Sequence, residues 1–187
     1  MAPRGPGLVN FGARRTGLGG RMERLATMAP ERQVPVFARK TFREGFRNRP
    51  VRNVGRPQVI LWPDTWNNHF HPATAEAAVD VLEAAGFQVT IPAVRLCCGR
   101  PLYDYGMLDL AKRMLRETLS ALRLQIRAGV CVVGLEPRCV SVFRDELVDL
   151  FPGDVDAKRI KEQTFLLPEL LARRGAHYAP PRRAQKQ

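Results

Sequence analysis

The sequence predicts an α/β fold: a three-layer, doubly wound, Rossmann-like and mostly parallel sheet. Short apolar runs rich in β-branched residues alternate with longer segments of helical periodicity, and Gly or Pro stands at their boundaries. Strands and helices that alternate in this way form βαβ units with parallel strands. A chain of 187 residues, 45% of them apolar, is long enough for one such domain with extensions.

Each expected element has a local signal. Buried strands are expected at 59–62, 87–91 and 130–135. Helices are expected at 72–85, 108–127, 140–150 and 156–174. The helix at 108–127 has the clearest apolar stripe, and Gly86 and Gly129 stand where a glycine ends a helix. The resulting β-α-β-α-β-α order is that of a doubly wound sheet.

The composition divides the chain into four parts. Residues 1–20 are rich in Gly, Pro and Arg and are expected to be disordered, because they can bury little apolar surface. Residues 21–57 are expected to be a helical or irregular docking segment and linker, followed by the α/β domain at 58–174. A disordered basic tail is expected at 175–187.

The net charge of +12 lies in the two ends of the chain. Residues 1–57 carry a net charge of +10 and residues 173–187 carry +5, whereas residues 58–172 carry −3. A nucleic-acid-binding domain would have its basic side chains on the folded part, so we expect no nucleic-acid partner. No apolar run reaches the length of a membrane span, and the first residues do not resemble a secretory signal. We therefore expect a cytoplasmic protein, located at the membrane surface at most through a partner.

Three cysteines lie in predicted turns after strands. Cys97 and Cys98 are adjacent, and Cys139 follows 41 positions after Cys98. Soft thiolates on Gly- and Pro-rich turns are typical of zinc and iron–sulfur sites, and the long separation excludes compact ferredoxin and zinc-finger spacings. The turns at the carboxyl ends of parallel strands open into the crevice where such sheets bind ligands. Cys131 lies within a strand instead and is expected to be a small core residue.

These motifs resemble the cysteine-rich "CCG" domain family. That family includes the cysteine-rich subunit of heterodisulfide reductase, the iron–sulfur subunits of glycolate oxidase and anaerobic glycerol-3-phosphate dehydrogenase, and domains fused to FAD-linked oxidases. The similar segments are LWPDTWNNHFHP at 61–72, CCGRPL at 97–102 and GLEPRC at 134–139, within a similarity that covers about 30–172. The chain resembles only the first half of the family's tandem, without its second Cys-Cys-Gly motif.

The resemblance implies an iron–sulfur electron-transfer module of a flavin-linked oxidoreductase, of the 2-hydroxy-acid or glycerol-3-phosphate type. Its cluster would be of the [4Fe–4S] type, with Cys97, Cys98 and Cys139 as ligands. FAD would lie on a partner or missing domain, and the expected partners are a flavin-containing dehydrogenase and a second CCG half. Arg138 stands where the family more often has a small residue, and its charge would raise the potential of a cluster.

The sequence leaves several alternatives open. The fourth ligand would come from a partner, the missing half, a substrate atom, or His69 or His71. One alternative is a zinc-binding or structural scaffold that uses the same cysteines. Another is a truncated, metal-free degenerate fragment, since three strands leave an edge unpaired. The acidic residues of the turns are expected to be ordinary caps rather than acid–base catalysts; they are Asp64, Asp104 and Glu136.

Overall fold

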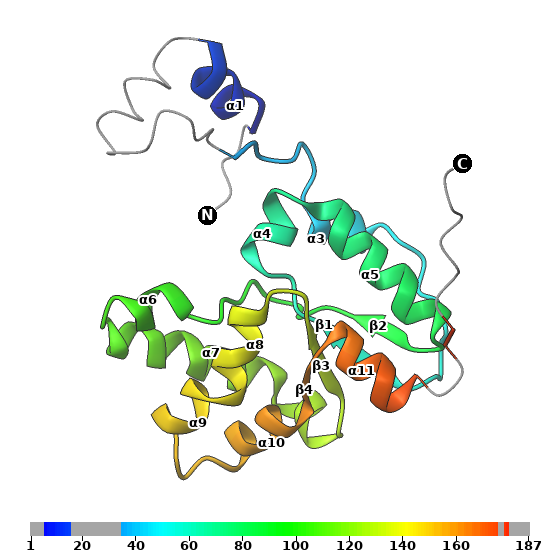
Figure 1. Cartoon of the computed structure of the whole chain (residues 1–187), viewed down its shortest axis with the longest axis vertical. Coiled ribbons are helices and arrows are strands. Elements are labelled where there is room, and N and C mark those ends of the chain that lie inside the picture. Colours follow the sequence, from blue (N-terminus) through cyan, green and yellow to red (C-terminus); the bar gives the residue numbers. More distant parts are fainter. Residues whose placement is uncertain (1–5, 16–34, 176–177, 180–187) are drawn as a thin grey trace. The chain divides into compact units, whose positions relative to one another are not determined.

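The computed structural model describes residues 6–15, 35–175 and 178–179 (Figure 1). These residues form two compact units, and each is described by itself. The smaller unit contains the described residues up to 49 together with 65–76. The larger unit contains 50–64 and the described residues from 77 onward, and it holds the sheet and all four cysteines.

The larger unit is built on a parallel sheet, which confirms the predicted α/β class. Its strands are β1 (Gln58–Leu61), β2 (Gln88–Thr90), β3 (Cys131–Gly134) and β4 (Thr164–Leu166), in the order β2-β1-β3-β4. All three pairings are parallel, with Val59 opposite both Val89 and Cys131. The chain first adds β2 on one side of β1 and then β3 on the other. The switch point of the sheet therefore lies between β1 and β3.

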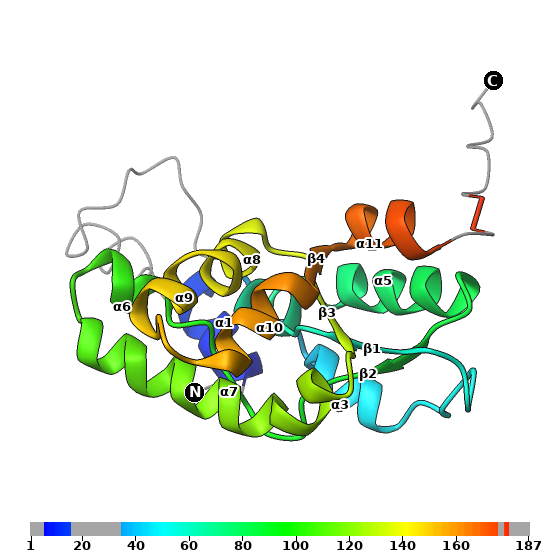
Figure 2. The same ribbon diagram turned by 90° about the horizontal axis from the view of Figure 1, so that it is seen from below.

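Helices cover both faces of this sheet. They are α5 (Pro72–Ala84), α6 (Arg100–Asp104), α7 (Leu108–Arg127), α8 (Pro137–Arg144), α9 (Glu146–Leu150), α10 (Val155–Gln163) and α11 (Leu167–Arg174). Figure 2 shows α11 and the part of α5 in this unit above the sheet, and α7 below it. Ile60 and Val132 pack with the apolar side chains of α7, α8 and α10 in one continuous core. This core lies directly beneath the turns that carry the cysteines.

The helix α7 has the bounds that its apolar stripe predicts. Leu115, Leu119, Leu122 and Ile126 are all buried, so the stripe faces the core along the whole helix. Gly129 follows the helix with a φ of +80°, the left-handed conformation in which a glycine ends a helix. The sequence signals for this element are therefore confirmed at both ends.

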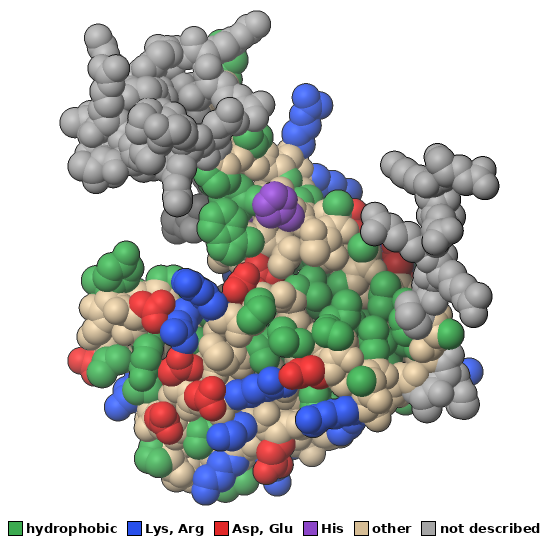
Figure 3. All heavy atoms as spheres, in the orientation of Figure 1, with side chains coloured by type: hydrophobic (Ala, Val, Ile, Leu, Met, Phe, Trp, Pro, Cys, Tyr) green, Lys and Arg blue, Asp and Glu red, His purple; other side chains and the backbone are tan. Residues whose placement is uncertain are grey.

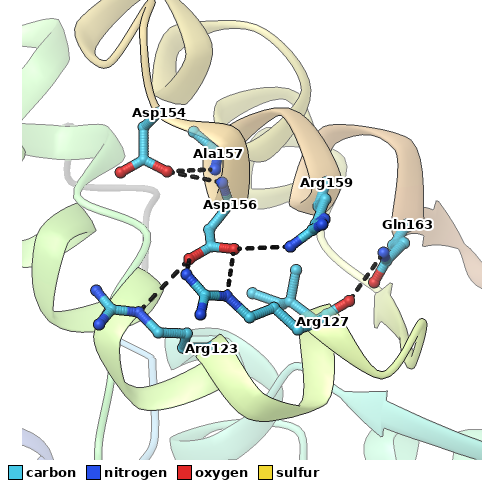
Figure 4. Close-up of polar contacts among 8 residues, drawn as sticks. Arg123, Arg127, Asp154, Asp156, Ala157, Arg159 and Gln163 are labelled. Carbon is cyan, nitrogen blue, oxygen red and sulfur yellow. Dashed lines mark hydrogen bonds and ion pairs between the residues drawn. The ribbon is translucent and has the colours of Figure 1, made fainter.

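An ion-pair cluster joins α7 to α10 (Figure 4). Arg127 of α7 donates two hydrogen bonds to the carboxylate of Asp156, at 3.0 and 2.9 Å. The Asp154 carboxylate accepts hydrogen bonds from the backbone N–H groups of Asp156 and Ala157, and so caps the first turn of α10. Together these contacts fix the start of α10 to the end of α7.

The helix predicted at 140–150 is wrong in its bounds. Two helices stand there: α8 begins earlier, at Pro137, and ends at Arg144, and α9 follows after Asp145. The Glu136 carboxylate accepts a hydrogen bond from the Arg138 N–H and caps α8, while proline at the first helical position needs no N–H partner. The chain turns at Asp145, which has φ −121° and ψ −75°. Cys139 therefore lies in the first turn of α8 rather than before a helix.

The single helix predicted at 156–174 is also wrong, because it contains a strand. Residues 164–166 form β4 between α10 and α11 and pair with β3. Thr164 and Phe165 are residue types that favour strands, and Pro168 has no N–H to continue a helix through this region. Apolar residues on both sides of 164–166 follow a helical spacing, so the sequence pattern predicts one continuous helix instead of this short strand.

The smaller unit consists of α1 (Pro6–Arg15), α3 (Phe42–Arg47), α4 (Thr65–His69) and the first residues of α5. Disorder is expected for 1–20, yet residues 6–15 form a helix here. The Asn10 side chain bonds to both backbone groups of Phe37 and so ties α1 to the segment before α3. Residues 21–34 and 180–187, for which docking and a basic tail are predicted, lie outside the described residues.

The surface of the larger unit agrees with its near-neutral sequence. In Figure 3 the Lys and Arg side chains alternate with Asp and Glu side chains over the visible face of this unit. No helix among the described residues is both long and apolar enough to cross a membrane.

Candidate metal centre

Two turns bring the cysteines together at the carboxyl end of the sheet. Cys97 and Cys98 end the segment that follows β2, and Cys139 lies in α8 directly after β3. The Sγ atoms of Cys98 and Cys139 are 3.1 Å apart, although 41 positions separate the two residues in the sequence. Cys98 and Cys139 are 5% and 8% exposed, and Cys97 is half-buried. The fold therefore brings Cys98 and Cys139 into contact, and their role as metal ligands together with Cys97 stays a prediction.

An apolar wall surrounds this pair. Cys98 and Cys139 belong to the same core cluster as Trp62, Leu115 and Phe143. The Trp62 and Phe143 rings meet edge to face, with centroids 4.8 Å apart. Since Trp62 follows β1 and Phe143 lies on α8, this contact fixes α8 against the switch point. The wall keeps water away from the two buried thiols.

Two glycines permit the close approach of these turns. Gly99, after the cysteine pair, has a φ of +76°, a left-handed conformation that side-chain-bearing residues rarely adopt. Gly134, at the end of β3, faces α8 so closely that an added Cβ would lie 2.4 Å from Val140 Cγ2. The first turn of α8, which carries Cys139, can therefore pack directly on β3.

Arg100 joins the two cysteine turns, a role that the sequence does not predict. Its guanidinium forms an ion pair with Glu146 on α9, reaches Ser141 on α8 at 3.5 Å, and pairs with Asp104 at 2.8 Å. Ser141 stands two positions after Cys139, and Arg100 stands two positions after Cys98. The only signal in the sequence is an arginine beside a cysteine turn, which does not indicate its partners.

The pKa values of the Cys97 and Cys98 thiols are raised above the usual range of a cysteine. The Cys139 thiol, followed by burial, raises the pKa of Cys98 to about 12. The pKa of Cys97 is raised far above its usual value, mainly by its contact with the Cys98 thiol and then by burial. Backbone N–H groups act in the opposite direction: those of Gly99 and Arg100 lower the pKa values of Cys97 and Cys98, respectively. These N–H groups are placed to stabilise thiolates when a cation binds.

The two candidate histidines belong to the smaller unit. His69 ends α4, and its ring Nε2 lies 3.0 Å from the Asn68 side-chain nitrogen. His71 is exposed, and its backbone N–H and C=O bond to Trp66 and Thr74. Because the cysteines lie in the other unit, metal ligation by either histidine stays a prediction.

The remaining candidates have structural positions. Cys131 is 2% exposed in β3 and lines a pocket of about 370 Å³ at the amino ends of the strands, away from the cysteine turns. Burial raises the pKa of its thiol, as for a core residue. Glu136 caps α8 and Asp104 pairs with Arg100, while Asp64 is buried directly after β1.

The donor atoms fit a soft metal or an iron–sulfur cluster, but the set is incomplete. Three thiols from two turns would provide three of the four thiolates that such a cluster takes. No group of three or more His, Cys, Asp or Glu side chains in the described part of the chain is arranged to hold a metal ion. Two thiolates on one tetrahedral zinc would lie about 3.8 Å apart, so the pair at 3.1 Å is closer than the ligands of one zinc.

Comparison with known proteins finds similarity to a dehydrogenase subunit and to lactate utilization proteins. One subunit of the anaerobic glycerol-3-phosphate dehydrogenase of Escherichia coli K12 is 26% identical over 145 residues, which cover 76% of this chain and 36% of that protein. Lactate utilization protein A of Oceanobacillus iheyensis is 35% identical over 78 residues, or 42% of this chain and 30% of the relative. The protein of the same name from Bacillus subtilis is 27% identical over 118 residues, which cover 61% of this chain and 48% of that protein.

The chain thus spans about a third to a half of the length of these relatives. No solved structure gives a significant match. One family, described as "CCG: Cysteine-rich domain", matches residues 64–144. This match includes Cys97, Cys98 and Cys139, so the resemblance seen in the cysteine motifs is confirmed: residues 64–144 match the CCG cysteine-rich domain family.

Proposed function

We propose that this chain is an iron–sulfur electron-transfer module of a flavin-linked oxidoreductase that oxidises a 2-hydroxy acid or glycerol 3-phosphate. The observation that supports the proposal is the contact of two buried thiols, those of Cys98 and Cys139, whose Sγ atoms lie 3.1 Å apart next to Cys97 at the carboxyl end of the sheet. Thiols in ordinary cores are scattered, whereas these meet from two turns that lie far apart in the sequence. The kinship with a dehydrogenase subunit and with lactate utilization proteins supports the same class of reaction.

Cys97, Cys98 and Cys139 would hold the cluster. A bound [4Fe–4S] cluster would supply transfer of single electrons between a flavin and a further acceptor. The backbone N–H groups of Gly99 and Arg100 would donate to the thiolates and stabilise their charge. The wall around Trp62 would exclude water, which keeps these interactions strong.

The missing ligand would come from outside the three cysteines. A second CCG half or a partner subunit is the proposed source, with FAD on the dehydrogenase component. We place the module in the cytoplasm, and any location at the membrane surface would come only through such a partner.

Metal analysis after anaerobic expression tests this proposal. Iron, sulfide and zinc are measured beside visible and EPR spectra for the wild type, Cys98→Ser and Cys131→Ala. We expect iron and sulfide in similar amounts in the wild type, loss of most of the visible absorbance in Cys98→Ser, and no loss in Cys131→Ala. The last variant is the matched control, because it also removes a buried thiol of the same unit.

Other outcomes would replace the proposal. One equivalent of zinc without iron would identify a structural metal site instead. A folded chain without metal, both alone and with a co-expressed dehydrogenase component, would identify a degenerate domain. Absorbance that survives in Cys98→Ser would remove Cys98 from the ligand set.

A further inference from the structure

We propose that Cys98 and Cys139 form an intramolecular disulfide when the protein is oxidised without a bound metal. The inference starts from their sulfur atoms, which are 3.1 Å apart in a buried site. A disulfide bond is about 2.05 Å long, so the two atoms need to approach by about 1 Å. Side-chain rotation and small shifts of the two turns provide a movement of this size.

The two turns hold the pair in place before any bond forms. Gly99 accepts hydrogen bonds from Leu102 and Tyr103 through its carbonyl oxygen, so the turn after Cys98 is closed. Cys139 donates its backbone N–H to the Glu136 carbonyl in the first turn of α8. Arg100 connects these turns through Ser141 and Glu146. Fixed turns keep the thiols close together and favour their reaction with each other.

Geometry disfavours the pairing of Cys97 with Cys98 and any pairing that involves Cys131. Cys97 and Cys98 are neighbours joined by a trans peptide, since the described residues contain no cis bond, and their Cα atoms are therefore about 3.8 Å apart. A disulfide usually needs a Cα separation of at least about 4.4 Å. Cys131 starts β3, and its side chain alternates with that of Val132, which faces the core beneath the cysteine turns. Cys131 therefore points to the opposite face of the sheet.

Hydrogen peroxide is a sufficient oxidant for this step. One thiol first loses its proton to solvent, and the resulting thiolate takes an oxygen atom from the peroxide to give a sulfenic acid and hydroxide, which takes up that proton to become water. The second thiol then displaces the sulfenic hydroxyl as a second water molecule and forms the S–S bond. Overall, two thiols lose two protons and two electrons, and one peroxide becomes two waters. The low exposure of both thiols favours a small oxidant over a bulky disulfide.

The disulfide itself does not depend on the proposed cluster. If the cluster exists, the bond has a consequence for it, because it would occupy two of the three thiols that hold the iron. A chain oxidised before assembly would then need a thiol reductant before it accepts a cluster, whereas a loaded chain would be protected from this oxidation.

Peptide mapping of the full chain tests the proposal. Metal-free protein, prepared with a chelator under reducing conditions and freed of reductant, is treated with peroxide, alkylated and digested with trypsin without reduction. Trypsin cuts after Arg95, Lys112, Arg127, Arg138 and Arg144 but not before Pro101. Cys97 and Cys98 then share the peptide 96–112, Cys139 lies in 139–144 and Cys131 lies in 128–138.

We expect one dominant cross-linked product that joins 96–112 to 139–144. Its mass should be two hydrogen atoms less than the sum of peptide 139–144 and peptide 96–112 with one alkyl group. Cys97 in this product should be alkylated, and the peptide 128–138 should be free and alkylated at Cys131. The link should persist in Cys97→Ser and be lost in Cys139→Ser. Circular dichroism of each variant checks its folding, and the wild-type map decides the question if a variant does not fold.

Three results would overturn the proposal. Free alkylated Cys98 and Cys139 after oxidation would show that the pair does not react, a link to 128–138 would show a different pairing, and alkylation of Cys98 instead of Cys97 would assign the bond to Cys97. Iron analysis plays no part in this readout. A failed disulfide and a failed cluster proposal are therefore distinguishable.

Discussion

The contact between Gly134 and α8 offers a quantitative test of how Cys139 is positioned. A Cβ on residue 134 would lie 2.4 Å from Val140 Cγ2, a distance that requires α8 or the Val140 side chain to move. Overpacking of this kind costs about 1–3 kcal/mol. Replacement of a strand glycine at a compatible φ also returns about 0.4–1 kcal/mol, because the unfolded chain loses freedom. Gly134→Ala should therefore destabilise the protein by about 1–2 kcal/mol.

A double-mutant cycle isolates the clash. Val140→Ala alone removes two buried methyl groups and should cost about 2 kcal/mol. In that background the Cγ2 atom is absent, so Gly134→Ala should become neutral or stabilise by about 0.5 kcal/mol. The coupling between the two changes should then be about 2 kcal/mol, within the range found for residues in direct contact.

Urea unfolding followed by Trp62 fluorescence is the assay. Trp62 is 2% exposed and packs on Phe143 of α8, and the Trp66→Phe background leaves it as the single tryptophan of the chain. Gly153→Ala is the matched control, because no atom lies within 4 Å of its added Cβ, and it should change the stability by less than about 0.5 kcal/mol. If Gly134→Ala lowers the free energy of unfolding equally in the wild-type and Val140→Ala backgrounds, the contact with Val140 is not the cause of the destabilisation.

Three further substitutions test other contacts by urea unfolding. Asp156→Asn should lower the free energy of unfolding by about 1 kcal/mol at neutral pH. The Asp156 carboxylate accepts two hydrogen bonds from Arg127, at 3.0 and 2.9 Å, and lies 3.5 Å from Arg123 and 3.4 Å from Arg159 (Figure 4). Arg127 holds the pKa of Asp156 below its usual value. This stabilisation should therefore be present above about pH 4 and disappear as the pH falls through the lowered pKa. A difference in unfolding free energy between wild type and variant that persists in acid would contradict this. Glu169→Gln should lower the free energy of unfolding by about 1 kcal/mol with the same pH trend, since Arg144 and then the Leu166 N–H lower the pKa of Glu169. An unchanged urea midpoint at pH 7 would show that Glu169 does not stabilise the fold through these contacts. Gly99→Ala should lower the free energy of unfolding by about 1–2 kcal/mol. The positive φ alone causes this loss, because the nearest atom to the added Cβ would be 3.6 Å away. No change in stability would mean that the turn relaxes.

The local sequence pattern was sufficient for most elements. The apolar stripe of α7 predicted its bounds, and the short β-branched runs predicted β1, β2 and β3 to within two residues at each end. Such signals are strong because the side chains that form them are buried on one face of a helix or on both faces of a strand. β4 was not identified, because a three-residue strand has no periodicity of its own and the apolar residues around it fit a helix.

The positions of the cysteines were readable from the turns, but their pairing was not. The carboxyl ends of β2 and β3 are separated by β1, or about 10 Å at the usual strand spacing. The segment after β2 returns across the end of β1 and brings Cys98 to Cys139. The strand order decides this path, and no spacing along the chain reports that order.

By itself the sequence determined the α/β class, the three thiols proposed to hold a cluster and the glycines in the turns that carry them, because each of these depends on local residue type and periodicity. Only the tertiary structure decided that Cys98 and Cys139 are in contact, that Arg100 joins their turns and that α8 packs closely on Gly134. These contacts join residues 41 to 46 positions apart or depend on how a helix packs on a strand. They are fixed by packing and strand order, which arise only when the whole sheet forms.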